Sequence, residues 1–233
     1  MVDVPPQEPA LRAIRDHLLA RRRSYALVGG LALAARAEPR FTRDVDLAVG
    51  VADEADAEGL VWELRRLGYR PIATVAHETL KRLATVRLGS PEGPVVDLLF
   101  ASSGIEPEVI ARATPVDVME VGSVLVTRAE ELLSMKVLSM SKRRRQDRVD
   151  ALSLLEMADV DLHAVRQNLA LIAERGFHRD QDLLAKLQGC STRLPRRTDL
   201  TMTPPSTRSG RGEWPRSSLS GHYGRTDGML HDR

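Results

Sequence analysis

The sequence predicts an α/β protein: a domain with a mixed sheet and flanking helices, then a helical domain, then a disordered tail. Up to about residue 126, segments with the two-residue period of strands alternate with segments of helical period. From about residue 127 to 189 only the helical period is found, and beyond it no apolar periodicity remains. We therefore expect an α/β domain over 1–126, a helical domain over 127–189 and a disordered tail over 190–233.

The first elements are expected to be a helix, a short strand and a second helix. Apolar residues recur at helical spacing over 6–23, which predicts an amphipathic helix. The apolar segment 25–28 predicts a strand that ends at Gly29 and Gly30. Small and aliphatic residues over 31–37 then favour a helix, which completes a strand, glycine turn and helix unit.

A second strand is predicted over 44–49, where apolar side chains alternate with Asp44 and Asp46. This period of two places both aspartates on the same face. Asp53 is then a suitable cap for a helix that ends at Gly68.

Two strand pairs follow. A hairpin over 83–88 and 95–100 places Asp97 inside an otherwise apolar strand, and a second pair is expected over 116–121 and 124–126.

The rest of the ordered chain is predicted to be helical. Thr127 and Glu130 have the spacing of a capping box at the start of the first of these helices. Helical periodicity is found over 128–143, 147–157, 162–175 and 180–188.

Charge is unevenly distributed, although the sequence pI is about 8.9. Residues 191–233 contain eight arginines against four acids, whereas the rest of the chain has a net charge of −2. The main part of the chain is therefore not a basic protein. In the tail, 29 of the 43 residues are Ser, Thr, Gly, Pro or Arg, which predicts disorder. Because Trp214 and Tyr223 are its only aromatic residues, the tail favours a solvated or non-native extension over an RNA-binding arm.

The sequence favours a cytoplasmic protein without membrane contact. Its single cysteine, Cys190, cannot form an intramolecular disulfide. The N-terminus lacks the basic and apolar regions of a signal peptide. The longest nearly unbroken apolar stretch, 25–35, is far shorter than the ~18 to 20 residues of a membrane span.

Three aspartates form a candidate catalytic centre. Asp44 and Asp46 lie about 7 Å apart along their strand and repel each other unless a cation lies between them. Carboxylates on a rigid strand suit Mg²⁺, and Asp97 is the natural third ligand because a lone buried acid usually has a partner. The alternative is that the D-x-D pair decorates the solvated face of an edge strand. The preceding Gly29-Gly30 turn strengthens the first interpretation, since bare backbone N–H groups at a helix start can receive a triphosphate.

Two segments carry a resemblance to a known superfamily: Val28-Gly29-Gly30-Leu31-Ala32-Leu33-Ala34 and Arg40-Phe41-Thr42-Arg43-Asp44-Val45-Asp46-Leu47. They resemble the motif of DNA polymerase β-like nucleotidyltransferases, and their GG-x-A…R-x-T-x-D-x-D form is similar to the AbiEii/AbiGii toxin group. The second position of the turn is commonly serine in the wider superfamily, so Gly30 cannot supply a hydroxyl contact to phosphate. The resemblance covers about residues 20 to 160.

The resemblance implies roles for particular residues. The implied catalytic residues and ligands of two Mg²⁺ ions, which Mn²⁺ can replace, are Asp44, Asp46 and Asp97. Of these, Asp97 would hold the catalytic ion and help to deprotonate the acceptor. The residues implied to position the triphosphate are Gly29, Gly30 and Arg43.

Two further segments, 132–138 and 145–150, extend the resemblance. They imply that Lys136 touches the nucleotide phosphates and that Asp147 lies near the site or orients a basic group. The alternatives are that Lys136 is a snorkelling surface lysine and that Asp147 and Asp150 form surface salt bridges with 143–145. The basic residues of 142–148 can likewise be interpreted as an RNA backbone contact or as solvated helix ends.

The function implied is Mg²⁺-dependent transfer of a nucleoside monophosphate from a nucleoside triphosphate to an acceptor hydroxyl, with pyrophosphate leaving. As a type IV toxin of a toxin–antitoxin pair, the protein would modify RNA, specifically a tRNA acceptor end, and would have an antitoxin protein as partner. One alternative is nucleotidylation of a small molecule such as an aminoglycoside, or of a protein. Another is a non-catalytic nucleotide- or RNA-binding module such as an antitoxin, against which the three acids argue.

Overall fold

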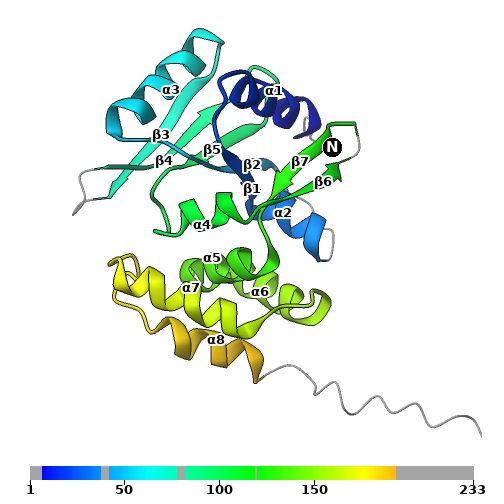
Figure 1. The fold of residues 1–233 in the computed structure, drawn as a ribbon, viewed down its shortest axis with the longest axis vertical. Helices are drawn as coiled ribbons and strands as arrows, with labels where there is room; N and C mark the ends of the chain where they lie inside the picture. Colours follow the sequence, from blue (N-terminus) through cyan, green and yellow to red (C-terminus); the bar gives the residue numbers. More distant parts are fainter. Residues whose placement is uncertain (1–6, 38–41, 78–81, 119, 193–233) are drawn as a thin grey trace, which may run out of the picture. The chain divides into compact units, whose positions relative to one another are not determined.

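The computed structural model describes residues 7–37, 42–77, 82–118 and 120–192. They form one seven-stranded mixed sheet with helices around it and a layer of helices packed below (Figure 1). The elements are α1 (Gln7–Ala20), β1 (Tyr25–Val28), α2 (Gly29–Arg36), β2 (Asp44–Val49), α3 (Glu54–Arg66), β3 (Arg70–His77), β4 (Arg82–Gly89), β5 (Val95–Leu99), α4 (Glu106–Ala111), β6 (Thr114–Val118), β7 (Gly122–Val126), α5 (Ala129–Ser139), α6 (Arg145–Met157), α7 (Leu162–Glu174) and α8 (Leu183–Ser191).

The sheet has the strand order β3-β4-β5-β2-β1-β7-β6. β2 is parallel to β5 and antiparallel to β1, while β4 is antiparallel to β5. The strand that carries Asp44 and Asp46 is therefore central, and the interpretation of these residues as the solvated face of an edge strand is wrong. A central strand needs an apolar face on the core side, which Val45 and Leu47 supply, both fully buried.

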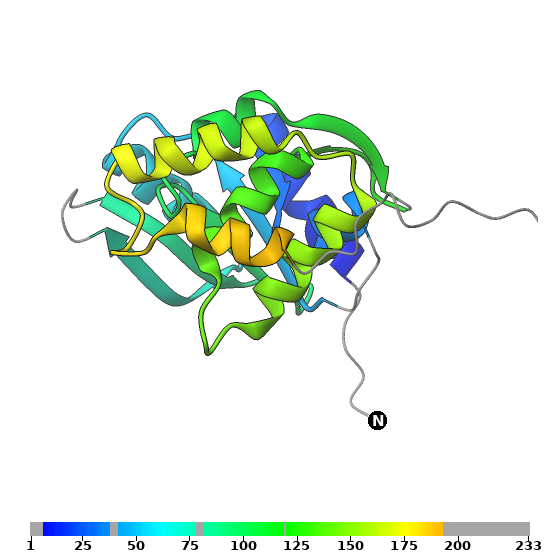
Figure 2. The ribbon, with the colours of Figure 1, turned by 90° about the horizontal axis from the view of Figure 1, so that it is seen from below.

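The helical layer is built around α5. Apolar side chains surround this helix, and every residue from Ala129 to Leu138 is buried. A helix that is buried all round lies inside a packed layer. α5 lies between the sheet and the outer helices α7 and α8 (Figure 2).

Several local predictions are confirmed. The Asp53 side chain accepts a hydrogen bond from the backbone N–H of Asp56 at the start of α3, at 2.9 Å. Gly68 follows that helix with a φ of 93°, in the region where glycine is favoured. Asp161 caps α7 by accepting from the N–H of His163 at 2.8 Å.

Other local predictions are wrong. Thr127 does not form a capping box, because α5 begins one residue later and the Thr127 hydroxyl is buried without a partner among the described residues. Its intended partner, Glu130, instead accepts a hydrogen bond from the N–H of Asp161 at 3.3 Å. The predicted helix over 128–143 ends at Ser139.

Two elements of the structure were not predicted from the sequence. β3 is an exposed edge strand, and α4 has only six residues with a proline in its first turn, so neither has a clear apolar period.

The division at residue 126 stays a prediction, and the predicted disorder of the tail concerns residues almost entirely outside those described. No helix among the described residues is long and apolar enough to cross a membrane.

Candidate active site

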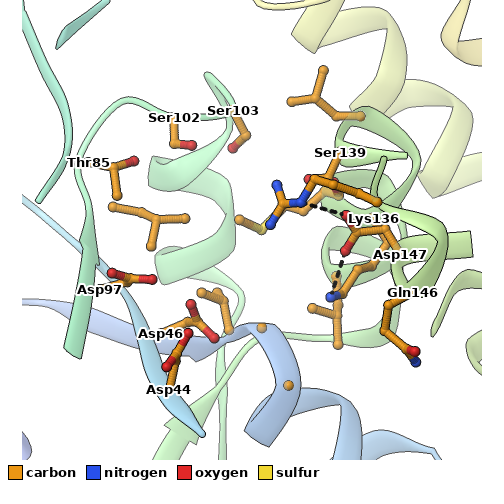
Figure 3. A pocket seen from close by; sticks show the side chains of 18 of the residues that line it. Asp44, Asp46, Thr85, Asp97, Ser102, Ser103, Lys136, Ser139, Gln146 and Asp147 are labelled. Atoms are coloured by element: carbon orange, nitrogen blue, oxygen red, sulfur yellow. Dashed lines mark hydrogen bonds and ion pairs between the residues drawn. The ribbon is translucent and has the colours of Figure 1, made fainter. Parts of the chain in front are cut away.

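The three aspartates predicted from the sequence come together at the centre of the sheet. The parallel pairing of β2 with β5 places Asp46 directly opposite Asp97, and Asp44 lies two residues earlier on the same face as Asp46. All three line a cleft of about 690 Å³. The other predicted site residues also line this cleft: Gly29, Gly30, Arg43, Lys136 and Asp147. Figure 3 shows the aspartates on the sheet side and Lys136 with Asp147 on the helical side.

The glycine turn makes room for one of these aspartates. Gly29 has a φ of 65°, and a Cβ atom at this position would lie 2.0 Å from Oδ2 of Asp46. Neither the backbone conformation nor the space therefore admits a larger residue. The backbone N–H of Gly30 donates a hydrogen bond to Asp46. The turn thus holds the Asp46 carboxylate at the start of α2, in addition to its expected role toward a triphosphate.

Apart from the Gly30 N–H, which donates to Asp46, the start of α2 also offers N–H groups to an anion. Its N-cap residue, Val28, makes no side-chain hydrogen bond to the helix. The first N–H groups of a helix have no partner within the helix, and the helix dipole gives them partial positive charge. Both properties favour phosphate binding at this end of the cleft.

The environment of Asp46 disfavours its charged form. Burial and, after it, the negative charge of Asp97 raise the pKa of Asp46 to about 6, an effect that the nearby charge of Lys136 partly offsets. Burial also raises the pKa of Asp97, although a hydrogen bond from Arg87 opposes this rise. The two carboxylates are therefore short of positive charge, which is the condition that a bound cation relieves.

Arg87 is a site residue that the sequence analysis missed. It lies on β4 directly opposite Asp97. Its guanidinium donates from Nε to Oδ1 of Asp97 at 3.0 Å and from Nη2 to Oδ2 at 3.0 Å, and Nη2 also lies 2.5 Å from Oδ2 of Asp44. The two-residue period of the strand, which alternates Thr85 and Arg87 with buried apolar residues, was the signal that could have identified it.

No cluster of three or more acidic, histidine or cysteine side chains in the described part of the chain is arranged to hold a metal ion as it stands. The guanidinium of Arg87 lies against two of the three carboxylates concerned.

The chain matches a known protein family over most of its length. The family described as nucleotidyl transferase AbiEii toxin, type IV TA system, matches residues 13–216. The chain belongs to this AbiEii family. It is accordingly a nucleotidyltransferase, and the mixed α/β fold predicted from the sequence is confirmed by the seven-stranded mixed sheet and its flanking helices.

Solved structures give only distant likenesses. An antigenic nucleotidyltransferase-like protein from Paracoccidioides brasiliensis has 18% identity and a TM-score of 0.47, over 78% of this chain and 91% of that one. The lincosamide antibiotic adenylyltransferase LnuA has 16% identity and a TM-score of 0.43, over 64% and 96%. The Thermotoga maritima CCA-adding enzyme, complexed with tRNA, has 13% identity and a TM-score of 0.32, over 79% and 50%. No match was found among curated proteins.

On the helical side of the AbiEii-family cleft, Lys136 is buried and paired. Its Nζ lies 2.7 Å from Oδ2 of Asp150 and 3.2 Å from Oδ1 of Asp147, both on α6. Only 11% of the lysine side chain is exposed, so its interpretation as a snorkelling surface residue is wrong. The two aspartates are buried as well, and their interpretation as surface salt-bridge partners is therefore wrong, although Arg144 does contact Asp147 at 3.2 Å.

The remaining wall of the cleft comes from a loop that the sequence did not single out. Ser102 and Ser103 line the cleft after β5. The buried carboxylate of Glu106 accepts hydrogen bonds from the backbone N–H of Ser102 at 2.8 Å and of Ser103 at 2.6 Å. Nη2 of Arg179 donates to the Ser102 carbonyl at 2.9 Å, and burial lowers the pKa of this arginine. The loop is thus fixed from both sides.

Proposed function

We propose that this AbiEii-family enzyme transfers a nucleoside monophosphate from a nucleoside triphosphate to a hydroxyl group of RNA, specifically at a tRNA acceptor end. The observation that carries the proposal is the juxtaposition of the three aspartates with the open start of α2 inside one cleft. Carboxylates for cations and helix N–H groups for phosphate are the two requirements of a site that binds a metal-chelated triphosphate.

In this proposal the aspartates hold two Mg²⁺ ions, with Mn²⁺ as a substitute, once the guanidinium of Arg87 no longer lies against Asp44 and Asp97. Hard carboxylate oxygens on rigid strands suit these ions, and the raised pKa values of Asp46 and Asp97 mark a place where positive charge is favourable. Asp44, Asp46 and Asp97 would hold the ions. Bound Mg²⁺ supplies charge neutralisation and polarises the phosphoryl group.

The protein's own groups would place the reactants. Gly29, Gly30 and Arg43 bind the triphosphate at the start of α2, and Lys136 faces its phosphates from α5. The acceptor oxygen forms a bond to the α-phosphorus, the bond from that phosphorus to the β-phosphate oxygen breaks, and pyrophosphate leaves. Asp97 helps to remove the acceptor proton, for which a carboxylate with a raised pKa is suited. Placement and charge neutralisation account for most of the rate.

The charge at the cleft favours RNA over a cationic drug as the acceptor. Apart from Arg87, arginines line the cleft at positions 43, 143, 144, 145 and 179. Arginines attract the phosphate backbone of a nucleic acid, whereas an aminoglycoside carries several positive charges and would be repelled. The toxin family further implies an antitoxin protein as partner.

The test is a labelling experiment. The protein is incubated with Mg²⁺ and each labelled triphosphate in turn, in the presence of total cellular RNA or of an aminoglycoside, with folded Asp97→Asn as the inactive control. We expect one triphosphate to label RNA of tRNA size and the variant to label nothing. Label that enters the aminoglycoside but no RNA would replace the RNA proposal with drug modification.

A further inference from the structure

The guanidinium of Arg87 contacts carboxylate oxygens that a metal ion at this site would use. It contacts both oxygens of Asp97 and Oδ2 of Asp44. An ammonium or guanidinium group and a divalent ion satisfy the same need, which is to offset the repulsion between neighbouring carboxylates. They cannot do so on the same oxygen lone pairs at the same time.

The buried lysine on the facing wall is committed elsewhere. Lys136 is held by Asp150 and Asp147, and the side chains of this trio are between 1% and 11% exposed. Moving a buried lysine away from two buried carboxylates would leave uncompensated charges, which is costly. Lys136 is therefore a fixed part of the wall.

Arg87 has the opposite character. Its side chain is 42% exposed, and that of Asp44 is 34% exposed. The ion pair with Asp44 is reached by solvent and contributes little free energy. The two contacts with Asp97, whose side chain is 15% exposed, can be given up when another cation takes the place of the guanidinium. Its position on the strand beside Asp97 keeps it next to the cleft when it does so.

We propose that Arg87 is an exchangeable counter-ion of the metal site, which neutralises Asp44 and Asp97 in the resting enzyme and is displaced when a divalent ion binds. This inference rests on the metal site of the proposed function. The displaced guanidinium then faces the cleft, where the phosphates of an incoming triphosphate provide a new partner. Metal alone consequently binds weakly, and metal with nucleotide binds more strongly.

The test measures Mn²⁺ binding to the full-length protein without nucleotide, from the electron paramagnetic resonance signal of free Mn²⁺. Wild type is compared with Arg87→Gln and with Arg143→Gln, which removes the same charge from an exposed arginine of the same cleft. Loss of two partly exposed ion pairs corresponds to about tenfold tighter Mn²⁺ binding by Arg87→Gln. The control should stay within about twofold of wild type because it touches neither Asp44 nor Asp97.

A second variant and a second readout cover a failure to fold. Arg87→Lys retains the charge but lacks the planar fork that contacts both carboxylates, so it should bind Mn²⁺ about threefold more tightly than wild type. Arg87→Gln should melt below wild type in EDTA and gain more than wild type on addition of Mn²⁺. If both variants bind Mn²⁺ as wild type does or more weakly, the inference about Arg87 is wrong, but the proposed function is unaffected. If Mn²⁺ binds neither wild type nor variants, even with a nucleotide analogue, the metal site of the proposed function fails as well.

Discussion

Replacement of Gly29 by alanine is expected to disrupt the site through one added methyl group. The φ of 65° at this position costs an L-residue about 1–2 kcal/mol. The new Cβ would also lie 2.0 Å from Oδ2 and 2.5 Å from Cγ of Asp46, so the aspartate must leave its position opposite Asp97. We expect Gly29→Ala to lower the free energy of unfolding by about 1–3 kcal/mol and the transfer rate by at least about 100-fold.

Gly59→Ala provides the matched control. Gly59 lies within α3, and a Cβ added there would meet nothing within 4 Å. Alanine in an exposed helix should raise stability by about 0.5–1 kcal/mol and leave transfer unchanged. Urea unfolding gives the stability of both variants, and initial rates of label transfer give activity. A Gly29→Ala protein with wild-type stability and rate would show that Gly29 does not set the position of Asp46.

Three further predictions follow from the charges in the cleft. The pKa of Asp46 is about 6 in the folded protein and ~3.9 in an unfolded aspartate, so the free energy of unfolding falls as pH rises from about 4 through about 6 and Asp46 loses its proton. Asp46→Asn cannot ionise, and it should therefore melt above wild type at pH 8 in EDTA, with no such gain near pH 4. Lys136→Ala leaves two buried carboxylates without their cation and should lower the free energy of unfolding, measured in urea, by about 3–5 kcal/mol. Arg21→Ala removes a more exposed ion pair and should lower it by less than about 1 kcal/mol. Similar losses for the two variants would show that the contacts of Lys136 are unimportant for stability. Expression of the protein without an antagonist should slow bacterial growth. Replacement of the three arginines at 143–145 by glutamine should reduce RNA labelling far more than triphosphate binding, and should make RNA binding less dependent on salt. Unchanged RNA labelling would show that the RNA binds elsewhere.

The sequence predicted the faces of the strands but not their neighbours. Alternation placed Asp44 and Asp46 on one face because the period of two is a local property. The pairing of Asp46 with Asp97 is a long-range contact between strands about 50 residues apart, and no local period encodes it. Arg87 was missed for this reason. Its outward face was readable from the strand pattern, but its proximity to Asp97 depends on the register of β4 with β5.

Charged residues of the helical layer were misjudged because their burial depends on tertiary packing. Lys136 and Asp150 each look like surface residues in isolation, since lysine and aspartate are rarely buried unless paired. The packing of α5 against α6 brings them within 2.7 Å of each other, and each then provides the charge that permits the other to be buried. A sequence pattern contains both residues but not their distance.

The two sides of the cleft consequently differ in how firmly their charges are held. On the helical side Lys136 is fixed by two buried acids, a trio with a formal net charge of −1, so the positive charge of this side comes from the arginines at 143–145 and 179. On the sheet side Asp46 and Asp97 have raised pKa values, and the partly exposed Arg87 lies against Asp97. A ligand that brings its own cations together with negative phosphates satisfies both sides at once, whereas a bare cation meets competition from Arg87 and a bare phosphate meets the aspartates. This asymmetry favours a metal-chelated triphosphate over either component alone, because only the pair offers positive charge to the sheet and negative charge to the helices.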